Sequence, residues 1–310
     1  MKMQKVSTVL TKEEIEKIMV PKNDYIFKRL FGGIGREKIV KDFLEAILEE
    51  DIKSVKIGKE TILLPEEMTG KYGVLDVRVT LDNGTEVDVE IQTAKQMYIE
   101  KRAHFYASRL YEKSLKSGES YKYLNKVIVI FILTYEEFLD IERYHTKWKM
   151  TETQDSNFKF DELELHFIEL PKFLRTKYDK QRKIDQWLLF IDHTQKELIK
   201  EIMRENKNIK EADEKLEELK NDEHEQYLAW LELKKRLDYN TNMNYEYERG
   251  VEEGEKRGEK RGEKRGEKKG EKKGEKKGII KGAKNLKKLG MSVKEIIQAT
   301  GLDESEIEKL

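Results

Sequence analysis

The chain has 310 residues and no cysteine, and its 62 Lys and Arg residues balance 62 Asp and Glu residues. Disulfides and zinc–thiolate sites are therefore excluded, while the length suits one sizeable core with appendages. No apolar run reaches the roughly 18–20 residues that a membrane helix needs, and the first residues lack the apolar stretch of a signal peptide. We expect a protein of the reducing cytoplasm with no membrane partner.

Charge is distributed unevenly along the chain, although the formal net charge is zero. Residues 254–278 hold twelve Lys or Arg and six Glu, a net charge of +6, whereas residues 1–250 sum to −5. A mildly acidic body with a basic tail is compatible with nucleic-acid binding but does not require it.

Helices are predicted at the start of the chain. Asp24 directly precedes a short aromatic-rich helix, residues 25–31, which two glycines end. Asp24 therefore suits a helix N-cap or an early-turn acid at the positive end of the helix dipole. Residues 36–50 repeat apolar side chains at helical spacing and predict an amphipathic helix.

A β-hairpin is predicted over residues 74–92, because its two halves alternate apolar and polar side chains. The halves can be joined by a two-residue turn, Asn83-Gly84, or by a three-residue loop in which Gly84 is a left-handed bulge residue. The three-residue loop pairs Leu81 with Thr85. We favour it because only this register makes the chemistry of the polar face coherent.

In the favoured register Asp76 lies opposite Glu90 on the polar face and Arg78 lies opposite Asp88, whereas the two-residue turn would set Asp76 opposite Ile91. Opposed residues are about 4.5–5.5 Å apart at Cβ, and two carboxylates that close repel unless a cation lies between them. The pair therefore indicates a hard-metal site, since Mg²⁺ takes one or two carboxylates plus waters and phosphate oxygens. The alternative is the solvated acidic face of an ordinary hairpin.

A helix and a buried strand are predicted after the hairpin. Residues 95–118 suit a helix on which Arg102 and Tyr106 share one face. The continuous apolar run 126–134 suits a strand buried on both faces in the middle of a sheet. Two further strand-like segments follow, at residues 143–151 and 163–170.

The histidines of the strand-like segments, His145 and His166, are candidate metal ligands because imidazole binds metals. Neither has a carboxylate or histidine partner at a ligand spacing along the sequence. We therefore expect structural or surface roles for both.

The C-terminal part predicts three consecutive segments. Residues 186–249 form a charged helical extension, residues 250–282 carry a glycine at every fourth position, and residues 283–310 form a small module of short helices. Each glycine costs a helix about 0.8–1 kcal/mol relative to Ala, and the repeat also stacks like charges at i,i+4. A flexible basic linker and a glycine-striped helix packed on a partner helix both remain open. For the last segment we favour an interaction module over a helix-turn-helix that recognises a DNA sequence.

Asp76, thirteen intervening residues and then Glu90-x-Gln92 form a pattern that resembles the active-site core of PD-(D/E)XK nucleases. The chain looks most like the Rpn family of recombination-promoting nucleases and transposases, in which Gln replaces the usual Lys. The likeness continues at residues 23–32, 121–125 and 165–172, at Tyr72, Arg102 and Tyr106, and in the spaced glycines. It implies an α/β fold in residues 1–185, with a restriction-endonuclease-like mixed β-sheet flanked by helices and followed by a helical C-terminal extension.

The resemblance implies a metal-dependent DNA endonuclease linked to recombination, mobile elements or defence. Asp76, Glu90 and Gln92 would be catalytic. Asp76, Glu90 and the backbone carbonyl of Ile91 would bind Mg²⁺, with Mn²⁺ or another divalent cation as alternatives. Gln92 cannot carry the charge of a lysine, but its amide can donate and accept hydrogen bonds.

Three accessory residues have both a structural and a functional interpretation. Asp24 is either a helix-capping acid or the extra acidic residue that some nucleases of this type take from the first helix. Arg102 and Tyr106 are either a packed tyrosine beside a snorkelling arginine or part of the site, in which Arg102 binds the scissile phosphate or orients Glu90.

The partners that we expect are DNA and a second copy of the chain, in a homodimer or a higher homo-oligomer. The alternative function is a catalytically weak or inactive nuclease-fold protein that binds DNA or assembles with itself through its tail. RNA as substrate is a third alternative, because nothing in the sequence discriminates the sugar.

Overall fold

The computed structural model describes residues 10–58, 62–63, 73–74 and 77–310. The chain divides into two compact units, Met1–Lys235 and Arg236–Leu310. Each unit has its own apolar core among the described residues. None of the helices in the described part is long and apolar enough to cross a membrane.

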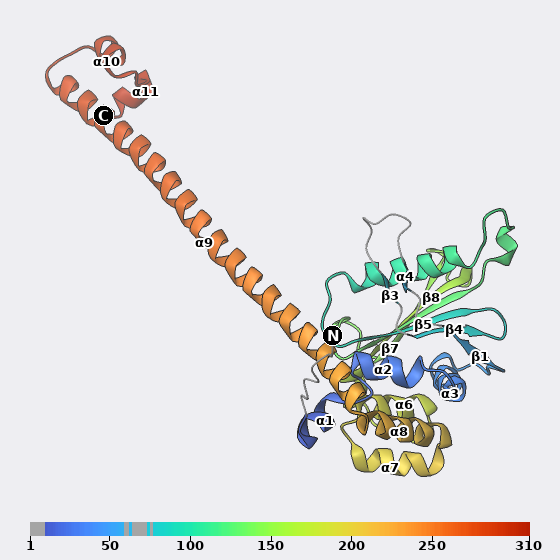
Figure 1. Cartoon of the computed structure of the whole chain (residues 1–310). Helices are drawn as coiled ribbons and strands as arrows, with labels where there is room; N and C mark the ends of the chain where they lie inside the picture. The colour runs from blue at the N-terminus through green and yellow to red at the C-terminus, as the bar shows by residue number, and fades with distance from the viewer. Residues whose placement is uncertain (1–9, 59–61, 64–72, 75–76) are drawn as a thin grey trace. The chain divides into compact units, whose positions relative to one another are not determined.

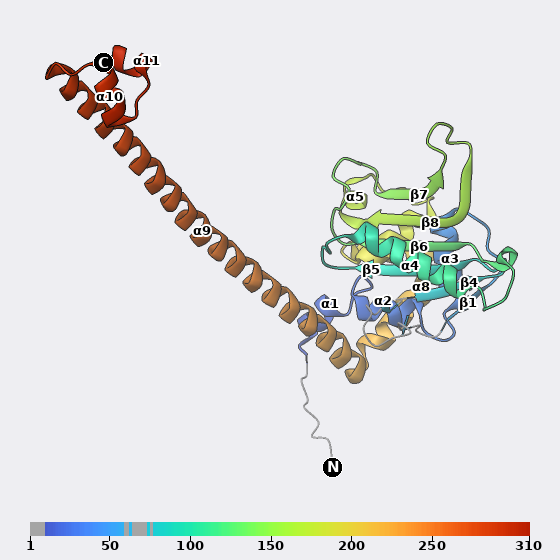
Figure 2. The ribbon, with the colours of Figure 1, turned by 90° about the horizontal axis from the view of Figure 1, so that it is seen from above.

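A six-stranded mixed sheet forms the centre of the first unit, in the order β1-β4-β5-β6-β8-β7 (Figure 2). The pairs β5–β6 and β6–β8 are parallel, and the other pairs are antiparallel. The strands of this sheet are β1 (Val55–Ile57), β4 (Val77–Leu81), β5 (Glu86–Gln92), β6 (Val127–Leu133), β7 (His145–Thr151) and β8 (Lys159–Glu169). A separate two-stranded sheet pairs β2 (Ile62–Leu63) with β3 (Gly73–Val74).

Helices cover both faces of the six-stranded sheet (Figure 1). One face carries α4 (Ile99–Lys113), and the other carries α2 (Asp24–Phe31) and α3 (Glu37–Leu48). Behind these two helices pack α6 (Lys183–Asp192) and α8 (Lys207–Lys220). The remaining helices of this unit are α1 (Lys12–Ile18), η1 (Tyr121–Tyr123), α5 (Leu170–Arg175) and α7 (Lys196–Glu205). The predicted mixed sheet flanked by helices is confirmed.

The central strand β6 is buried along its whole length, as its uninterrupted apolar sequence predicted. Because successive side chains of a strand point to opposite faces, the sheet separates two cores. Val87, Val89 and Ile91 of β5 belong to the larger core with α2, α3 and α6. The intervening polar residues of β5 therefore face α4, on the same side as Phe131 of β6.

The hairpin between β4 and β5 has the three-residue loop that the sequence favoured. The Leu81 amide donates to the Thr85 carbonyl at 2.9 Å, and Gly84 has a φ of +86°. Arg78 pairs with Asp88 across the two strands. The predicted register is thus confirmed for the described pairs.

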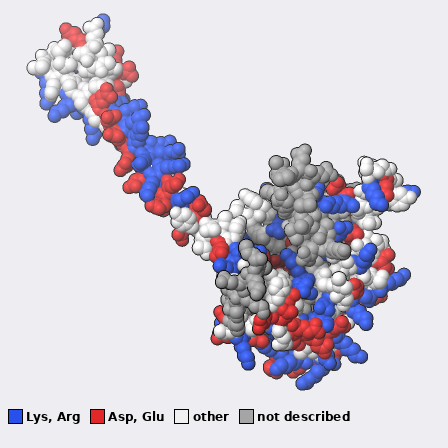
Figure 3. Space-filling view, viewed as in Figure 1, with Lys and Arg blue, Asp and Glu red and all other residues white. Residues whose placement is uncertain are grey.

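The second unit consists of helices. Its elements are the C-terminal part of α9 (Glu223–Lys288), α10 (Val293–Thr300) and α11 (Glu304–Glu308). A small core of Ala283, Ile296, Leu302 and Ile307 holds the three helices together. The glycine repeat, for which linker and helix were both open, is helical, and its basic side chains line α9 in Figure 3.

Candidate functional site

The candidate site lies where the three parallel strands end. Gln92 of β5 pairs with Leu133 of β6, which pairs with Glu169 of β8, so the C-terminal ends of these strands are level with one another. Ligands of open α/β sheets commonly bind outside the carboxyl ends of the strands. Glu90 and Gln92 project from this end of β5 toward the α4 side.

Glu90 is the central carboxylate of the described site. Its side chain is only 1% exposed, and its Oε2 accepts a hydrogen bond from Nε2 of Gln92 at 3.1 Å. The guanidinium of Arg102 lies 3.9 Å from the same oxygen. Sequence-predicted residues from β5 and α4 therefore meet around one buried carboxylate.

Arg102 is held in place by two further hydrogen bonds. Its Nε donates to the Tyr106 hydroxyl oxygen at 2.8 Å, and its Nη1 donates to Oε1 of Gln96. Tyr106 is 4% exposed and stacks on Phe131 of β6. Burial, reinforced by the charge of Glu90, raises the pKa of Tyr106 to about 12, so its hydroxyl stays protonated near neutral pH. Both interpretations of this residue pair describe part of the arrangement: Tyr106 is packed in the core, and Arg102 places its positive charge beside Glu90.

Two more acids share the polar face of β5 with Glu90. Glu86 accepts hydrogen bonds from Arg78 at 2.8 Å and from Thr80 at 3.0 Å, so its charge is balanced within the hairpin. Asp88 lies between Glu86 and Glu90 on this face and is fully buried. The face thus concentrates oxygen donors of the kind that hard cations bind.

The metal site predicted at Asp76 and Glu90 is only half represented, because Asp76 lies outside the described residues. Within the described part, no three His, Asp or Glu side chains are grouped so as to hold a metal ion. Ile91 follows Glu90, and its side chain packs into the larger core. The metal ligands therefore stay a prediction, with Glu90 as the buried oxygen donor that the structure describes.

Asp24 occupies the first turn of α2, where Asn23 is the N-cap. The Asn23 side chain accepts hydrogen bonds from the amides of Tyr25 and Ile26, and the Asp24 carboxylate lies 3.4 Å from the Lys28 ammonium. This ion pair and the helix dipole account for Asp24 as an early-turn acid. An accessory catalytic role for it stays a prediction.

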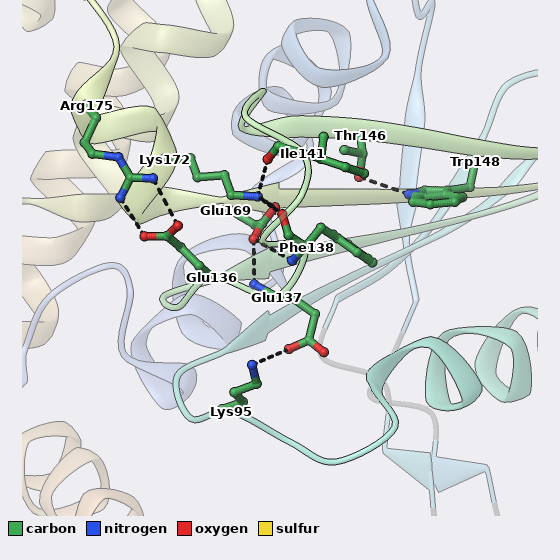
Figure 4. Close-up of polar contacts among 10 residues, drawn as sticks. All are labelled: Lys95, Glu136, Glu137, Phe138, Ile141, Thr146, Trp148, Glu169, Lys172 and Arg175. Carbon is green, nitrogen blue, oxygen red and sulfur yellow. Dashed lines mark hydrogen bonds and ion pairs between the residues drawn. The ribbon is translucent and has the colours of Figure 1, made fainter.

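A polar network fixes the chain that follows β6, at the same end of the sheet (Figure 4). Glu169 and Lys172 form its buried centre, being 0% and 3% exposed, and their charged groups are 2.6 Å apart. Glu137 of the fixed chain also forms an ion pair with Lys95, at 3.6 Å. Because Lys95 follows Gln92 closely in the chain, the network reaches the segment next to the candidate site.

The histidine prediction requires a correction. His145 and His166 contact each other, with 2.9 Å between Nε2 and Nδ1, and His166 contacts Glu164 at 2.9 Å. The sequence prediction that they lack a partner is wrong, because residues two apart in a strand share a face and paired strands bring distant residues together. Burial lowers the pKa of both imidazoles.

Sequence reasoning did not single out Gln96, Tyr135, Glu137 or Glu169 as site residues. These side chains come together at the strand ends only through the order of the strands. Two of them did carry a usable signal, because Tyr135 follows the apolar strand β6 by two residues and Glu169 is the last residue of β8. Gln96 and Glu137 lie in connecting loops, where no periodic pattern marks a side chain.

Comparisons with known proteins agree with this geometry. The model of the PD-(D/E)XK nuclease family transposases matches residues 21–246. Searches of curated proteins and of solved structures give no match. The family match covers most of the first unit, including both strands of the hairpin and the helix that carries Arg102. With its mixed sheet, its hairpin register and Glu90 at the end of a central strand, the chain belongs to the PD-(D/E)XK nuclease family transposases.

Proposed function

We propose that this protein is a metal-dependent endonuclease that hydrolyses phosphodiester bonds in DNA. One observation carries the proposal beyond family membership: the buried Glu90 carboxylate has an amide and a guanidinium beside it at the carboxyl end of a central strand. A carboxylate that can hold a hard cation and an arginine that can bind a phosphate both suit the hydrolysis of a charged diester.

Divalent-metal chemistry fits the donors on the polar face of β5. Glu90 and Asp76 would hold one or two Mg²⁺ or Mn²⁺ ions, together with the Ile91 carbonyl. The described ladder ends one residue from Asp76, with Val77 opposite Val89, and its register is the one from which the Asp76–Glu90 pair was predicted. When bound, the metal would polarise the phosphate and lower the pKa of the attacking water.

The protein side chains would orient the reacting groups. Gln92 donates to Glu90 and so fixes the direction of that carboxylate. Arg102 supplies the positive charge that Gln92 lacks, and its side chain is about one-third exposed, so a phosphate can reach it. Tyr106, which stays protonated, holds the guanidinium beside Glu90. We assign Arg102 to the scissile phosphate and Tyr106 to the support of Arg102.

Plasmid cleavage tests the proposal directly. Supercoiled DNA would be incubated with the wild type, Asp76→Ala and Glu90→Gln, each with Mg²⁺ and with EDTA. Glu86→Gln is the matched control, because it makes the same change on the same face of β5, where Glu86 is bound to Arg78. Metal-dependent cutting by the wild type and the control alone supports the proposal, and retained cutting by Asp76→Ala refutes the assignment of the acid.

A second candidate function, DNA binding or assembly without turnover, is favoured by the basic helix. Arg261, Lys264, Arg265 and Lys268 cluster on exposed α9. Their replacement by Gln in the full chain should weaken binding to duplex DNA and flatten its salt dependence, because each phosphate contact releases a counterion. If the Gln variant loses binding and the wild type binds DNA but never cuts it, this second function is favoured.

The remaining parts of the proposal concern biological setting. We propose DNA rather than RNA as substrate, a homodimer or higher homo-oligomer, and a role in the cytoplasm in recombination, mobile elements or defence. Light scattering after size exclusion measures the oligomer. Parallel assays on duplex DNA and on RNA of the same sequence decide the substrate.

A further inference from the structure

The chain between β6 and β7 is held by contacts at residues 136, 137, 138 and 141. Oε1 of Glu169 accepts from the backbone amides of Glu137 at 2.6 Å and Phe138 at 3.2 Å. The Lys172 ammonium donates to the carbonyls of Phe138 and Ile141, each at 2.6 Å (Figure 4). The buried Glu169–Lys172 pair thus bonds to backbone groups that have no partner in a neighbouring strand. We call residues 134–144 the β6–β7 loop.

Two further contacts hold the same loop from its sides. The Glu136 carboxylate forms a bidentate salt bridge with the Arg175 guanidinium, at 2.6 and 3.0 Å. The Phe138 ring packs against Phe167 and Trp148, with centroids 5.1 and 5.5 Å apart. A loop that is held by so many contacts beside a candidate site is suited to positioning a side chain against a ligand.

Tyr135 is the residue that this fixed loop presents to the candidate site. Its ring packs against the core on the α4 side of the sheet, the side of Glu90 and Gln92. Its hydroxyl oxygen is buried, and no acceptor among the described residues takes its proton. The backbone of Gln96 lies near enough to interact with the oxygen. Buried polar groups nearly always have hydrogen-bond partners, so a hydroxyl proton without an acceptor beside a candidate site points to a ligand oxygen.

The hydroxyl also has the surroundings and the protonation state of a phosphate donor. Burial raises the pKa of Tyr135 to about 12, while the Arg102 guanidinium is near enough to act in the opposite direction. Gln96 connects the two residues, since its side chain accepts from Arg102 and its backbone lies beside Tyr135. Tyr135 therefore keeps its proton near the cation that lies beside Glu90.

We propose that the Tyr135 hydroxyl donates a hydrogen bond to a phosphate oxygen of the nucleic acid at the Glu90 site, and that Glu169 and Lys172 position the loop that carries it. This inference rests on the proposed nuclease function. It extends the site from β5 and α4 to the end of β6, and it assigns the buried Glu169–Lys172 pair a positioning role.

The test compares Tyr135→Phe with Tyr111→Phe, a matched control because Tyr111 packs partly buried against the same core. Single-turnover cleavage of an end-labelled DNA duplex with Mg²⁺ should be about tenfold or more slower for Tyr135→Phe, since hydrogen bonds to charged groups are the strong ones. Tyr111→Phe should match the wild type, and both variants should keep the wild-type melting temperature. Equal cleavage by Tyr135→Phe and the wild type would overturn the inference.

A binding measurement separates this inference from the proposed function. Fluorescence anisotropy with the same duplex in EDTA compares the wild type, Tyr135→Phe and Tyr111→Phe. If the wild type binds but never cuts, weaker binding by Tyr135→Phe alone still supports the phosphate contact, and equal binding overturns it. A folded wild type that neither cuts nor binds refutes both proposals together.

The positioning role is tested by non-additivity. The full chain with Glu169→Gln and Lys172→Met keeps the pair neutral but loses the donors to the β6–β7 loop. If the pair acts through Tyr135, adding Tyr135→Phe to this double variant should slow cleavage much less than it does in the wild type. Additive losses would show that the pair supports the fold without positioning Tyr135.

Discussion

Replacing Lys172 by Met should destabilise the first unit strongly. The substitution keeps the side-chain length but removes all three donated bonds, to Glu169, Phe138 and Ile141. The Glu169 carboxylate would then be a fully buried charge without its counter-ion. Removing one partner of a buried ion pair typically costs about 3–5 kcal/mol.

The size of the unit converts this cost into a melting temperature. For domains of 150–250 residues, about 1 kcal/mol shifts the melting temperature by 2–4 °C, so we expect a fall of roughly 6–20 °C for the 235-residue unit. Thermal melting followed by circular dichroism measures it. Adding Glu169→Gln should recover part of the loss, because the lone buried charge disappears.

Arg175→Met provides the matched control for this experiment. It breaks the Glu136–Arg175 ion pair of the same loop, but the Arg175 side chain is 61% exposed. Exposed ion pairs contribute little to stability, so its melting temperature should stay near that of the wild type. Equal shifts for Lys172→Met and Arg175→Met would refute the reasoning that burial makes the difference.

Three further predictions concern pH, the glycine repeat and the site. Burial lowers the pKa of His145 to about 3, so the unfolded chain takes up a proton below about pH 6.5 that the folded state resists. Stability should therefore fall as the pH falls below about 6.5. The urea midpoint should drop less between pH 7 and pH 5 for His145→Gln than for the wild type, and equal drops would contradict this. Nothing lies within 4 Å of a Cβ added at Gly262 or Gly270, so alanine at each position should stabilise the helix by about 0.8–1 kcal/mol. Circular dichroism should show increased helicity, and reduced helicity would contradict the prediction. Arg102→Gln should lower kcat about 10²-fold, and its melting temperature should fall less than that of Lys172→Met, because Arg102 is one-third exposed and 3.9 Å from Glu90. An unchanged kcat would remove Arg102 from the site.

Several features of the fold could be predicted from the sequence because they depend on neighbours along the chain. The Asp82-Asn83-Gly84 loop determines the hairpin register, since only a left-handed residue such as Gly84 closes it in that way. The apolar run of β6 predicts a central strand, since every face of such a strand must be buried. The pattern of Glu90 and Gln92 predicted the family that the comparison found.

The glycine repeat shows where local reasoning stops. Helix propensity and the like-charge spacing both oppose a helix at residues 254–278, yet these residues continue α9. Intrinsic propensity is a weak guide when the segments on either side form helix. The sequence therefore left linker and helix open at this position.

Sequence patterns alone predict the class of fold, the family and the strand that carries Glu90, because alternation, turn chemistry and motif spacing are local properties. The three-dimensional arrangement is needed to see that Arg102, Gln96 and Tyr135 lie near that carboxylate. It is also needed to see that Glu169 and Lys172 hold the loop beside it. These residues come from the connection between β5 and β6, from the β6–β7 loop, and from the end of β8 with α5. Their meeting depends on strand order and on which face each side chain takes, which non-local packing decides.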